Sequence, residues 1–182
     1  MWSPFHRSIY IQPIRHPNKR DVELSFRRMQ VNDIDQVHNI DLLSFHLAWP
    51  RSSFNFEVER NTASQPWVAV LHDADGKDRI VAMIVLWVIM DEAHIATFAV
   101  HPAYRLMGVG KKLLTHALQQ AYYQGARMAF LEVRRGNQAA QLLYSGFGFK
   151  VDGVRQRYYQ DNHEDALLMT LEPLSEEPLK NK

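Results

Sequence analysis

A glycine-containing segment between a predicted strand and a predicted helix is the sharpest chemical signal in this chain. Residues 105–112 read Arg-Leu-Met-Gly-Val-Gly-Lys-Lys and follow a predicted strand that ends at Val100. Two glycines let a ligand approach the backbone closely, and the unpaired amides of a helix's first turn attract an anion such as a pyrophosphate. The spacing matches neither a P-loop nor a full dinucleotide fingerprint, which disfavours nucleoside-triphosphate and NAD chemistry. By itself the segment is also compatible with a tight strand-to-helix turn.

Length and composition indicate one compact domain that must build any anion site locally. The chain has 182 residues, of which 46% are hydrophobic and 23% charged, enough for one core and too few for two ordinary domains. Its formal net charge is +1, so no overall positive field attracts DNA. Cysteine is absent, which excludes disulfides, thiolate metal ligands and a cysteine nucleophile, and fits the reducing cytoplasm.

The two ends of the chain differ in composition from its middle. Residues 1–22 carry basic side chains without the apolar stretch of a secretory signal. We expect them to form a flexible basic extension, with an organelle transit peptide or an RNA-contacting arm as alternatives. The domain is then expected over residues 23–172, and residues 173–182 as a frayed tail. The longest apolar run, Ile80–Met90, is far shorter than the roughly 20 residues that span a bilayer, so no membrane association is expected.

Hydrophobic periodicity predicts the order of elements that must position the glycine segment. A leading strand and two helices precede an antiparallel meander, and alternating strands and helices follow, as in an α/β domain. The expected strands are Leu24–Met29, Trp67–Leu71, Ile80–Met90, Ala93–Val100, Ala129–Val133, Phe147–Val151 and Ala166–Leu171, with a turn at Asp75-Gly76. The expected helices start at Asn32 or Asp33, at Ser52 or Ser53 (where a strand fits equally well), near Val109, and at Asn137; the last two end at Gly125 and Gly146.

The order of elements and the glycine segment together resemble the GNAT superfamily of N-acetyltransferases. Arg-x-x-Gly-x-Gly after a strand and a His-Pro turn is similar to the acetyl-CoA pyrophosphate loop of that family. The RimI-type branch is matched more closely, at Asp91–Ile95, Phe98–Pro102, Leu131–Arg134, Asn137, Leu143-Tyr144, Gly148-Phe149, Arg157–Tyr159 and Glu164–Ala166. The resemblance implies a mixed, mostly antiparallel sheet of about six to seven strands flanked by about four helices. It also implies acetylation of the N-terminal alanine of a small-subunit ribosomal protein.

The resemblance further implies which residues hold acetyl-CoA. Phe98, Ala99 and Val100 would line the thioester, and Asn137 would contact the pantetheine arm. An extended arm can pair with a strand edge as another strand would, and a backbone N–H there can meet the thioester oxygen as it gains negative charge. The pyrophosphate would be held by Arg105, Leu106, Met107, Gly108, Val109, Gly110 and Lys111. Leu106 and Met107 stand where many relatives carry polar or basic residues, which matters little for a loop that acts through its backbone amides.

Glu132 and Tyr144 are the acid–base pair that the resemblance implies. In the RimI-type branch a glutamate at this place removes the amine proton, often through water, and the tyrosine protonates the leaving thiolate. A glutamate is a weak base unless its surroundings raise its pKa, but an α-amine is roughly a tenth neutral at pH 7, against about one lysine amine in 2,500. A weak base therefore suits an N-terminal amine better than a lysine. Without the motif, Glu132 is also compatible with a salt-bridged strand end and Tyr144 with a packed helix aromatic.

Two irregular segments supply candidates for the peptide groove. They carry His46 and Trp49, and Arg157, Tyr158 and Tyr159, and loop packing is the alternative for all five. The nine histidines form no metal-ligand pattern, so no metal is expected. The sequence thus predicts a cytoplasmic acetyl-CoA-dependent enzyme that acetylates a protein N-terminus. A small-amine or lysine acetyltransferase is the first alternative, and a non-catalytic CoA-sensing or ribosome-interaction module is the second.

Overall fold

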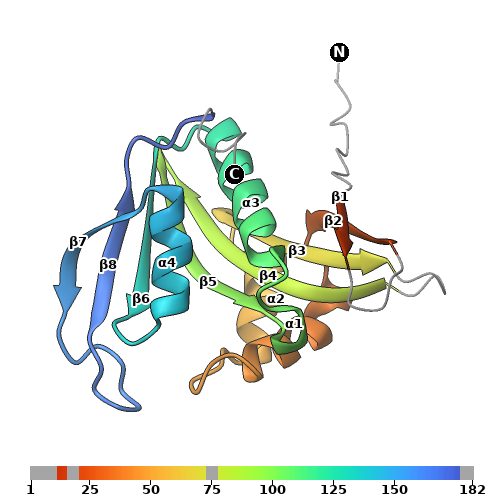
Figure 1. The fold of residues 1–182 in the computed structure, drawn as a ribbon, viewed down its shortest axis with the longest axis horizontal. Coiled ribbons are helices and arrows are strands. Elements are labelled where there is room, and N and C mark those ends of the chain that lie inside the picture. Colours follow the sequence, from red (N-terminus) through yellow and green to blue (C-terminus); the bar gives the residue numbers. More distant parts are fainter. Residues whose placement is uncertain (1–11, 16–20, 73–77, 177–182) are drawn as a thin grey trace.

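A single twisted sheet organises the chain in the computed structural model, which describes residues 12–15, 21–72 and 78–176 (Figure 1). In this part of the chain the sheet has eight strands in the order β1-β2-β3-β4-β5-β6-β8-β7, antiparallel except for the pair β5–β6. The strands are β1 Gln12–Arg15, β2 Asp21–Arg28, β3 Ser64–His72, β4 Asp78–Ile89, β5 Glu92–Val100, β6 Met128–Arg134, β7 Lys150–Arg155 and β8 Ala166–Leu171. The predicted α/β class with a mostly antiparallel sheet is confirmed, with β1 as a strand beyond the six to seven expected.

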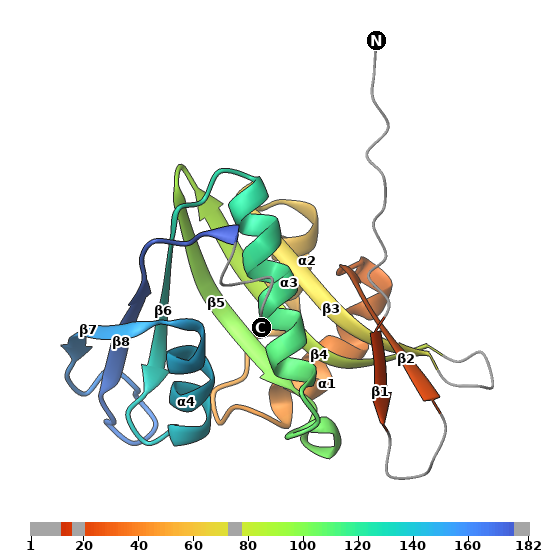
Figure 2. The same cartoon turned by 45° about the horizontal axis from the view of Figure 1, so that its top comes forward.

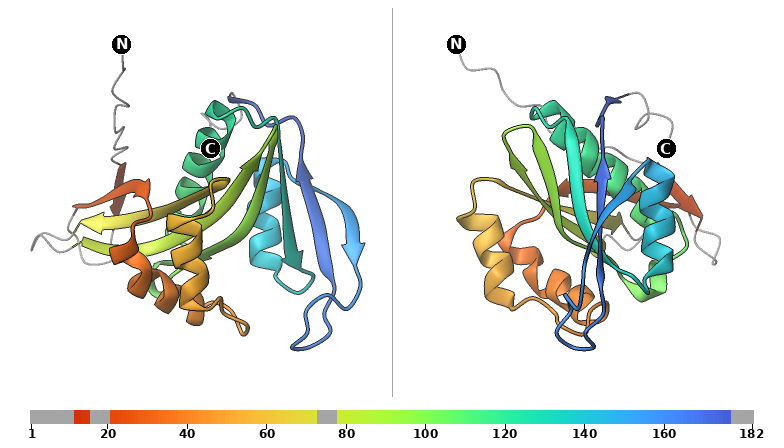
Figure 3. Two further views of the ribbon diagram at one scale, coloured as in Figure 1. Left: turned by 180° about the vertical axis from the view of Figure 1, so that it is seen from behind. Right: turned by 90° about the vertical axis from the view of Figure 1, so that its left-hand side faces the viewer.

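Helices cover both faces of the sheet. The helices α1 (Ile34–Leu42) and α2 (Arg51–Glu59) pack on one face, and α3 (Val109–Tyr123) and α4 (Gln138–Phe147) lie on the other (Figure 3). Short 3-10 turns, η1 (Val31–Asp33) and η2 (Pro102–Tyr104), precede α1 and follow β5. The apolar stripe predicted on α3 is buried against the sheet, at Leu113, Leu114, Ala117, Leu118 and Ala121. The sheet thus separates two hydrophobic clusters, one under each helix pair.

The strands β5 and β6 pair along only part of their length. Their parallel register runs from Glu92 opposite Met128 to Ile95 opposite Leu131 and goes no further. Next to this point the β4–β5 register shifts by one residue, which makes Ala96 a bulge on β5, and a bulge bends its strand. Beyond it the two strands diverge toward the carboxyl end of β5 (Figures 1 and 2). The fold therefore leaves a gap in the middle of its own sheet.

The end of α4 differs from the prediction. The sequence predicts a stop at Gly146 and a strand from Phe147, but Phe147 is the last residue of the helix and is buried. The residue that caps the helix is Gly148, whose φ of +99° is left-handed and favours glycine. Its N–H donates to the Ser145 carbonyl oxygen at 2.9 Å, which closes the final turn. The strand β7 accordingly begins at Lys150.

The starts of α1 and α2 differ in detail from the prediction. Asp33 precedes α1, but its carboxylate makes no capping bond to that helix. It accepts instead from the Gln30 N–H at 2.7 Å and from the Arg27 guanidinium at 2.5 and 2.8 Å. The helix α2 starts at Arg51 after Pro50, not at a serine cap. Of the two alternatives for this segment, the helix is the one observed.

Packing extends on both sides of the predicted domain. Residues 12–15 of the basic extension pair with β2 as β1, and the rest of that extension up to residue 20 lies outside the described residues, as does the predicted Asp75-Gly76 turn. Beyond residue 172, Leu174 is buried, and its N–H donates to the Arg127 carbonyl oxygen at 2.6 Å. None of the described helices has the length and hydropathy to cross a bilayer.

A histidine is buried between α3 and the sheet. The ring of His116 is 5% exposed and lies between Phe26, at 5.4 Å between ring centroids, and Trp67, at 4.6 Å. Within the described residues its Nε2 atom has no hydrogen-bond partner. Burial disfavours the charged imidazolium and lowers the pKa of His116 to about 4. The folded protein therefore keeps this ring neutral under conditions that protonate an ordinary histidine.

We expect His116 to make the free energy of unfolding fall in mild acid. Above pH 6.5 neither state is protonated at this ring; as the pH falls from 6.5 toward 4 the unfolded chain takes up a proton that the folded one does not. The loss amounts to up to about 3 kcal/mol. Urea unfolding of the wild type and of His116→Leu, at pH 7 and at pH 4.5, measures it. An equal pH dependence in the two proteins would contradict this assignment.

Candidate active site

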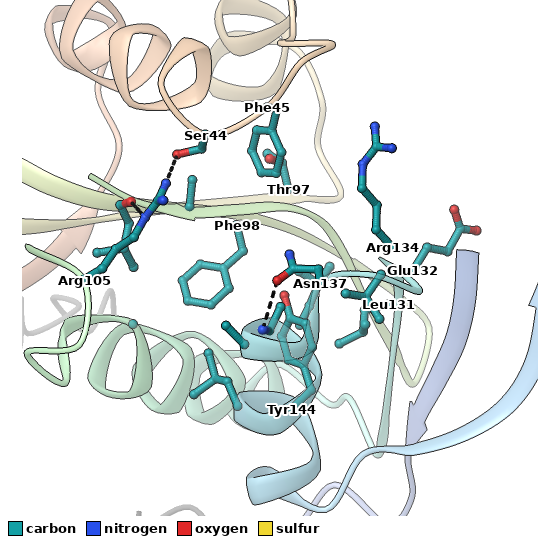
Figure 4. Close-up of a pocket in the computed structure, with 18 of the residues that line it drawn as sticks. Ser44, Phe45, Thr97, Phe98, Arg105, Leu131, Glu132, Arg134, Asn137 and Tyr144 are labelled. Carbon is teal, nitrogen blue, oxygen red and sulfur yellow. Dashed lines mark hydrogen bonds between the residues drawn. The ribbon is translucent and has the colours of Figure 1, made fainter. Parts of the chain in front are cut away.

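The gap between β5 and β6 opens into a cavity of about 1010 Å³. Its walls come from the α1–α2 connection, β5, the segment before α3, β6 and α4, as Figure 4 shows. The predicted residues that line it are His46, Trp49, Phe98, Ala99, Val100, Arg105, Leu106, Gly108, Gly110, Lys111, Glu132, Asn137, Tyr144 and Tyr159. Tyr159 comes from the loop between β7 and β8, so the fold gathers most of the predicted site from six segments of the chain.

The glycine segment forms the N-terminal turn of α3, as predicted. Gly108 is the N-cap residue with a φ of +79°, and its carbonyl oxygen accepts from the Lys112 N–H at 3.1 Å. The amides of the preceding positions in the first turn therefore lack acceptors within the helix. A Cβ atom at Gly110 would lie 3.1 Å from Val100 Cγ2, so glycine allows the helix to approach β5 closely. With Lys111 beside it, this turn fits an anionic group.

Within residues 105–111 some side chains are packed in the core and others are exposed to solvent. Val109 is buried and Met107 packs against the hydrophobic cluster under α3. Leu106 has a left-handed φ of +62° and is fully exposed at the cavity's edge. The side chain of Arg105 donates from Nε to the Val100 carbonyl oxygen at 3.0 Å and from Nη2 to Ser44 Oγ at 3.1 Å. Met107 and Val109 can therefore meet a ligand only through their backbone.

The carboxyl half of β5 presents a free backbone edge to the cavity. Thr97 to Val100 pair with β4 on one side, and no pairing with β6 extends past Ile95 on the other. The side chains of Phe98 and Val100 pack toward α3, and that of Ala99 joins the cluster under α1. The edge of β5 is therefore available to pair with an extended ligand.

Tyr144 lies deep in the cavity between aromatic neighbours. It is 7% exposed, with ring centroids 6.4 Å from Phe98 and 5.7 Å from Phe149. Burial, assisted by nearby Tyr159, raises the pKa of Tyr144 well above the ordinary value of a tyrosine. Burial likewise raises the pKa of Tyr159 to about 12. Both hydroxyl groups are therefore protonated and able to donate at neutral pH.

Glu132 faces away from Tyr144. On β6 its neighbours Leu131 and Val133 pack under α3 and α4, so the alternation of the strand directs Glu132 to the opposite face. Figure 4 shows its carboxylate turned away from Phe98 and Tyr144. Oε1 lies 2.6 Å from Arg155 Nη1, and a hydrogen bond with Glu132 is the main cause of the raised pKa of Tyr158. The structure therefore brings Glu132 to the cavity but pairs its carboxylate with β7 and the segment after it.

A second arginine fixes the loop between β7 and β8. Arg134 contacts Asp161 at 2.9 Å and Glu164 at 3.3 Å, and its guanidinium lies 3.8 Å from the centre of the Tyr159 ring. Glu164 also accepts from the Gly136 N–H at 2.5 Å. Sequence reasoning did not assign a role to Arg134 or Arg155, although both stand within the motifs it singled out or beside them.

The five predicted groove residues are not all brought together. His46, Trp49 and Tyr159 line the cavity, whereas Arg157 and Tyr158 are not part of its lining. The Arg157 N–H donates to Asp165 Oδ1 at 3.0 Å in a left-handed turn. In the part of the chain that the structure describes, no three metal-ligating side chains gather as a metal site would require.

Comparison with known proteins gives the family of the fold that holds this cavity. The model of the acetyltransferase (GNAT) family matches residues 34–149. A Bacillus subtilis relative is 37% identical over 143 residues, which cover 79% of this chain and 91% of the relative. The ribosomal protein bS18-alanine N-acetyltransferase of Escherichia coli K12 is 30% identical over 148 residues, which cover 80% of this chain and 99% of that protein. The crystal structure of the Escherichia coli ribosomal-protein-S18-alanine N-acetyltransferase matches with a TM-score of 0.73 at 27% identity, covering 84% of this chain and 95% of that one. The chain belongs to the GNAT family of acetyltransferases, and the predicted GNAT fold is confirmed.

Asn137 offers a test that separates binding from folding. Its Oδ1 atom caps α4 by accepting from the Ala140 N–H at 3.1 Å, so Nδ2 is the group left to donate to a ligand in the cavity. We expect Asn137→Ser to keep the cap and lose the amide donor, and Asn137→Ala to lose both. Only the alanine variant should lower the unfolding free energy, by about 1 kcal/mol. Both should weaken acetyl-CoA binding, as calorimetry can measure; unchanged affinity in the serine variant would remove Asn137 from the ligand site.

Proposed function

We propose that this protein is an acetyl-CoA-dependent N-α-acetyltransferase that transfers the acetyl group directly to a protein N-terminus. The observation that carries the proposal is the cavity between β5 and β6, which joins the N-terminal turn of α3, a free strand edge and the buried Tyr144. Acetyl-CoA supplies the acetyl group as a reactive thioester. A solved structure from Bacillus anthracis, at 25% identity and a TM-score of 0.66, is described in complex with acetyl coenzyme A.

The chain's own residues supply binding and charge stabilisation. The first-turn amides of α3 and Lys111 hold the pyrophosphate, and the edge from Phe98 to Val100 pairs with the pantetheine arm. A backbone N–H of Ala99 or Val100 donates to the thioester oxygen as negative charge develops there. These groups sit on a rigid strand and a helix end, so little reorganisation accompanies the reaction.

Two side chains move the protons. Glu132 is on β6 and faces away from α4, and Tyr144 is on α4. The amine nitrogen bonds to the acetyl carbon while the carbon–sulfur bond breaks. The proton that the nitrogen loses goes to the Glu132 carboxylate, directly or through water, and the Tyr144 hydroxyl donates to the departing sulfur. No covalent enzyme intermediate forms. The Glu132 carboxylate is held for this task by Arg155 Nη1, 2.6 Å from Oε1, and by its hydrogen bond with Tyr158.

The substrate we propose is the N-terminal alanine of ribosomal protein bS18. Two curated relatives that carry this activity in their names, from Escherichia coli and Haemophilus ducreyi, are 30% and 33% identical to this chain over 99% and 90% of their own lengths. At pH 7 a larger fraction of an α-amine than of a lysine amine is neutral and able to attack, which supports the same choice. A ribosomal substrate puts the enzyme in the cytoplasm, in keeping with a chain without cysteine.

Tyr144→Phe should lower turnover about 100-fold or more, because general-acid donation contributes at least that much. The Kd for acetyl-CoA should stay nearly unchanged, since the phenyl ring still fills the space beside Phe98. Steady-state kinetics and calorimetry measure the two quantities. Tyr122→Phe, on α3 and outside the cavity lining, is the matched control. Wild-type turnover in the Tyr144 variant would contradict its role as the acid.

A peptide panel tests the substrate class. We expect acetylation of a peptide that starts with the bS18 N-terminal alanine, and none of the same peptide with a blocked N-terminus, of internal lysines or of small polyamines. Mass spectrometry of the products gives the modified nitrogen. Preference for a polyamine or a lysine would favour the first alternative, and acetyl-CoA binding without any turnover would favour a non-catalytic module.

A further inference from the structure

Glu132 shares its carboxylate with a cation at the border of the cavity. Its Oε1 atom lies 2.6 Å from Nη1 of Arg155, which β7 brings from the edge of the sheet (Figure 1). The Arg155 guanidinium also lies 5.5 Å from the centre of the Tyr158 ring, and Tyr158 has a hydrogen bond with Glu132. The Glu132 side chain is 29% exposed and lines the cavity. A charged group that approaches Glu132 therefore meets Arg155 as well.

Both carboxylates that line the cavity in the described part of the chain have an arginine partner. They belong to Glu132 and Glu164, and Glu164 Oε2 lies 3.3 Å from Arg134 Nη1. The basic side chains of the lining outnumber them and are Arg105, Lys111 and Arg134. The cavity therefore offers a cationic substrate no unpaired carboxylate.

An amine enters such a cavity more easily as the neutral base than as the ammonium ion. Moving a charge out of water is costly unless an opposite charge receives it, and the ion pair with Arg155 offsets the charge of Glu132. At pH 7 about a tenth of an α-amine is neutral, against about one in 2,500 of an alkyl amine such as that of lysine. A cavity that admits only the neutral form favours the α-amine by about 250-fold.

We propose that Arg155 determines the choice of acceptor: by offsetting the charge of Glu132 it excludes acceptors with several ammonium groups, such as polyamines, and favours a protein α-amine. The inference rests on the proposed function and gives the origin of its substrate class. Arg155 acts through Glu132 and does not need to touch a reacting atom. Without Arg155 the cavity holds an unpaired carboxylate, which attracts an ammonium ion.

Calorimetry with spermidine measures this effect without relying on turnover. The enzyme is saturated with CoA, which carries no acetyl group, and the Kd of spermidine is measured at pH 7 for the wild type and for Arg155→Gln. The glutamine amide keeps a hydrogen-bond donor near Glu132 but carries no charge. The Kd should be at least about five-fold lower in the variant, the factor that one unit charge at about 4 Å provides even in water.

Two further variants separate charge from shape. Arg155→Lys restores the positive charge and should restore the weak spermidine binding of the wild type. Lys150→Gln is the matched control, because it removes the same charge from an exposed position of β7, roughly 16 Å along the strand and beyond the Debye length of about 8 Å. It should bind spermidine as the wild type does. Added salt should reduce the gain in Arg155→Gln, because salt screens the freed carboxylate.

Inhibition kinetics complete the test. Spermidine should inhibit acetylation of the bS18 N-terminal peptide with a Ki at least about five-fold lower in Arg155→Gln than in the wild type. Equal spermidine affinity in the two proteins, or none measurable in either, overturns the inference and leaves the proposed function standing, and so does tight binding in Arg155→Lys. A wild-type enzyme that acetylates spermidine in preference to the peptide overturns both.

Discussion

The interruption of backbone pairing between β5 and β6 is the constraint on which the whole cleft depends. Each strand keeps its other neighbour, since β4 holds β5 and β8 holds β6, so the two can separate after Ile95 and Leu131 without losing their place in the sheet. The bulge at Ala96 supplies the bend. Side chains satisfy part of the freed edges, since Arg105 donates to the Val100 carbonyl oxygen and Gln141 to that of Arg134; the remaining backbone N–H and C=O groups must be satisfied by water or by a ligand. A molecule that carries amides of its own is a natural partner for such an edge.

Sequence patterns predicted those parts of the fold that are encoded locally. The stripe on α3 and the glycine turn before it each lie within a few residues, and the structure has both. The bulge at Ala96 could not be predicted in this way, because it exists only in relation to the register of β4. The end of α4 was misplaced since Gly146 and Gly148 are both acceptable stops from sequence. The burial of Phe147 in the core, a tertiary effect, decides between them.

The candidate site was also predictable from sequence where its residues are contiguous, and not where they come from distant parts of the chain. The turn to which we assign the pyrophosphate is contiguous in the chain, so its residues could be proposed together from sequence. The side chains of Met107 and Val109 pack into the core, which leaves only their backbones for a ligand. The partners of Glu132 and Arg134 come from β7 and the loop before β8, more than 20 positions away. No local sequence pattern predicts such ion pairs. They make the β7–β8 segment a part of the site's electrostatics, where Arg155 and Arg134 each neutralise carboxylates that border the cavity.

The exposed leucine at the mouth of the cavity has a practical consequence. Leu106 projects fully into solvent beside the turn assigned to the pyrophosphate, and the chain contains no cysteine at all. A cysteine introduced at this one position would therefore be the sole thiol of the protein. A fluorescent dye attached there would sit next to the loop without displacing any core side chain, and its emission would report occupancy of the cleft in real time.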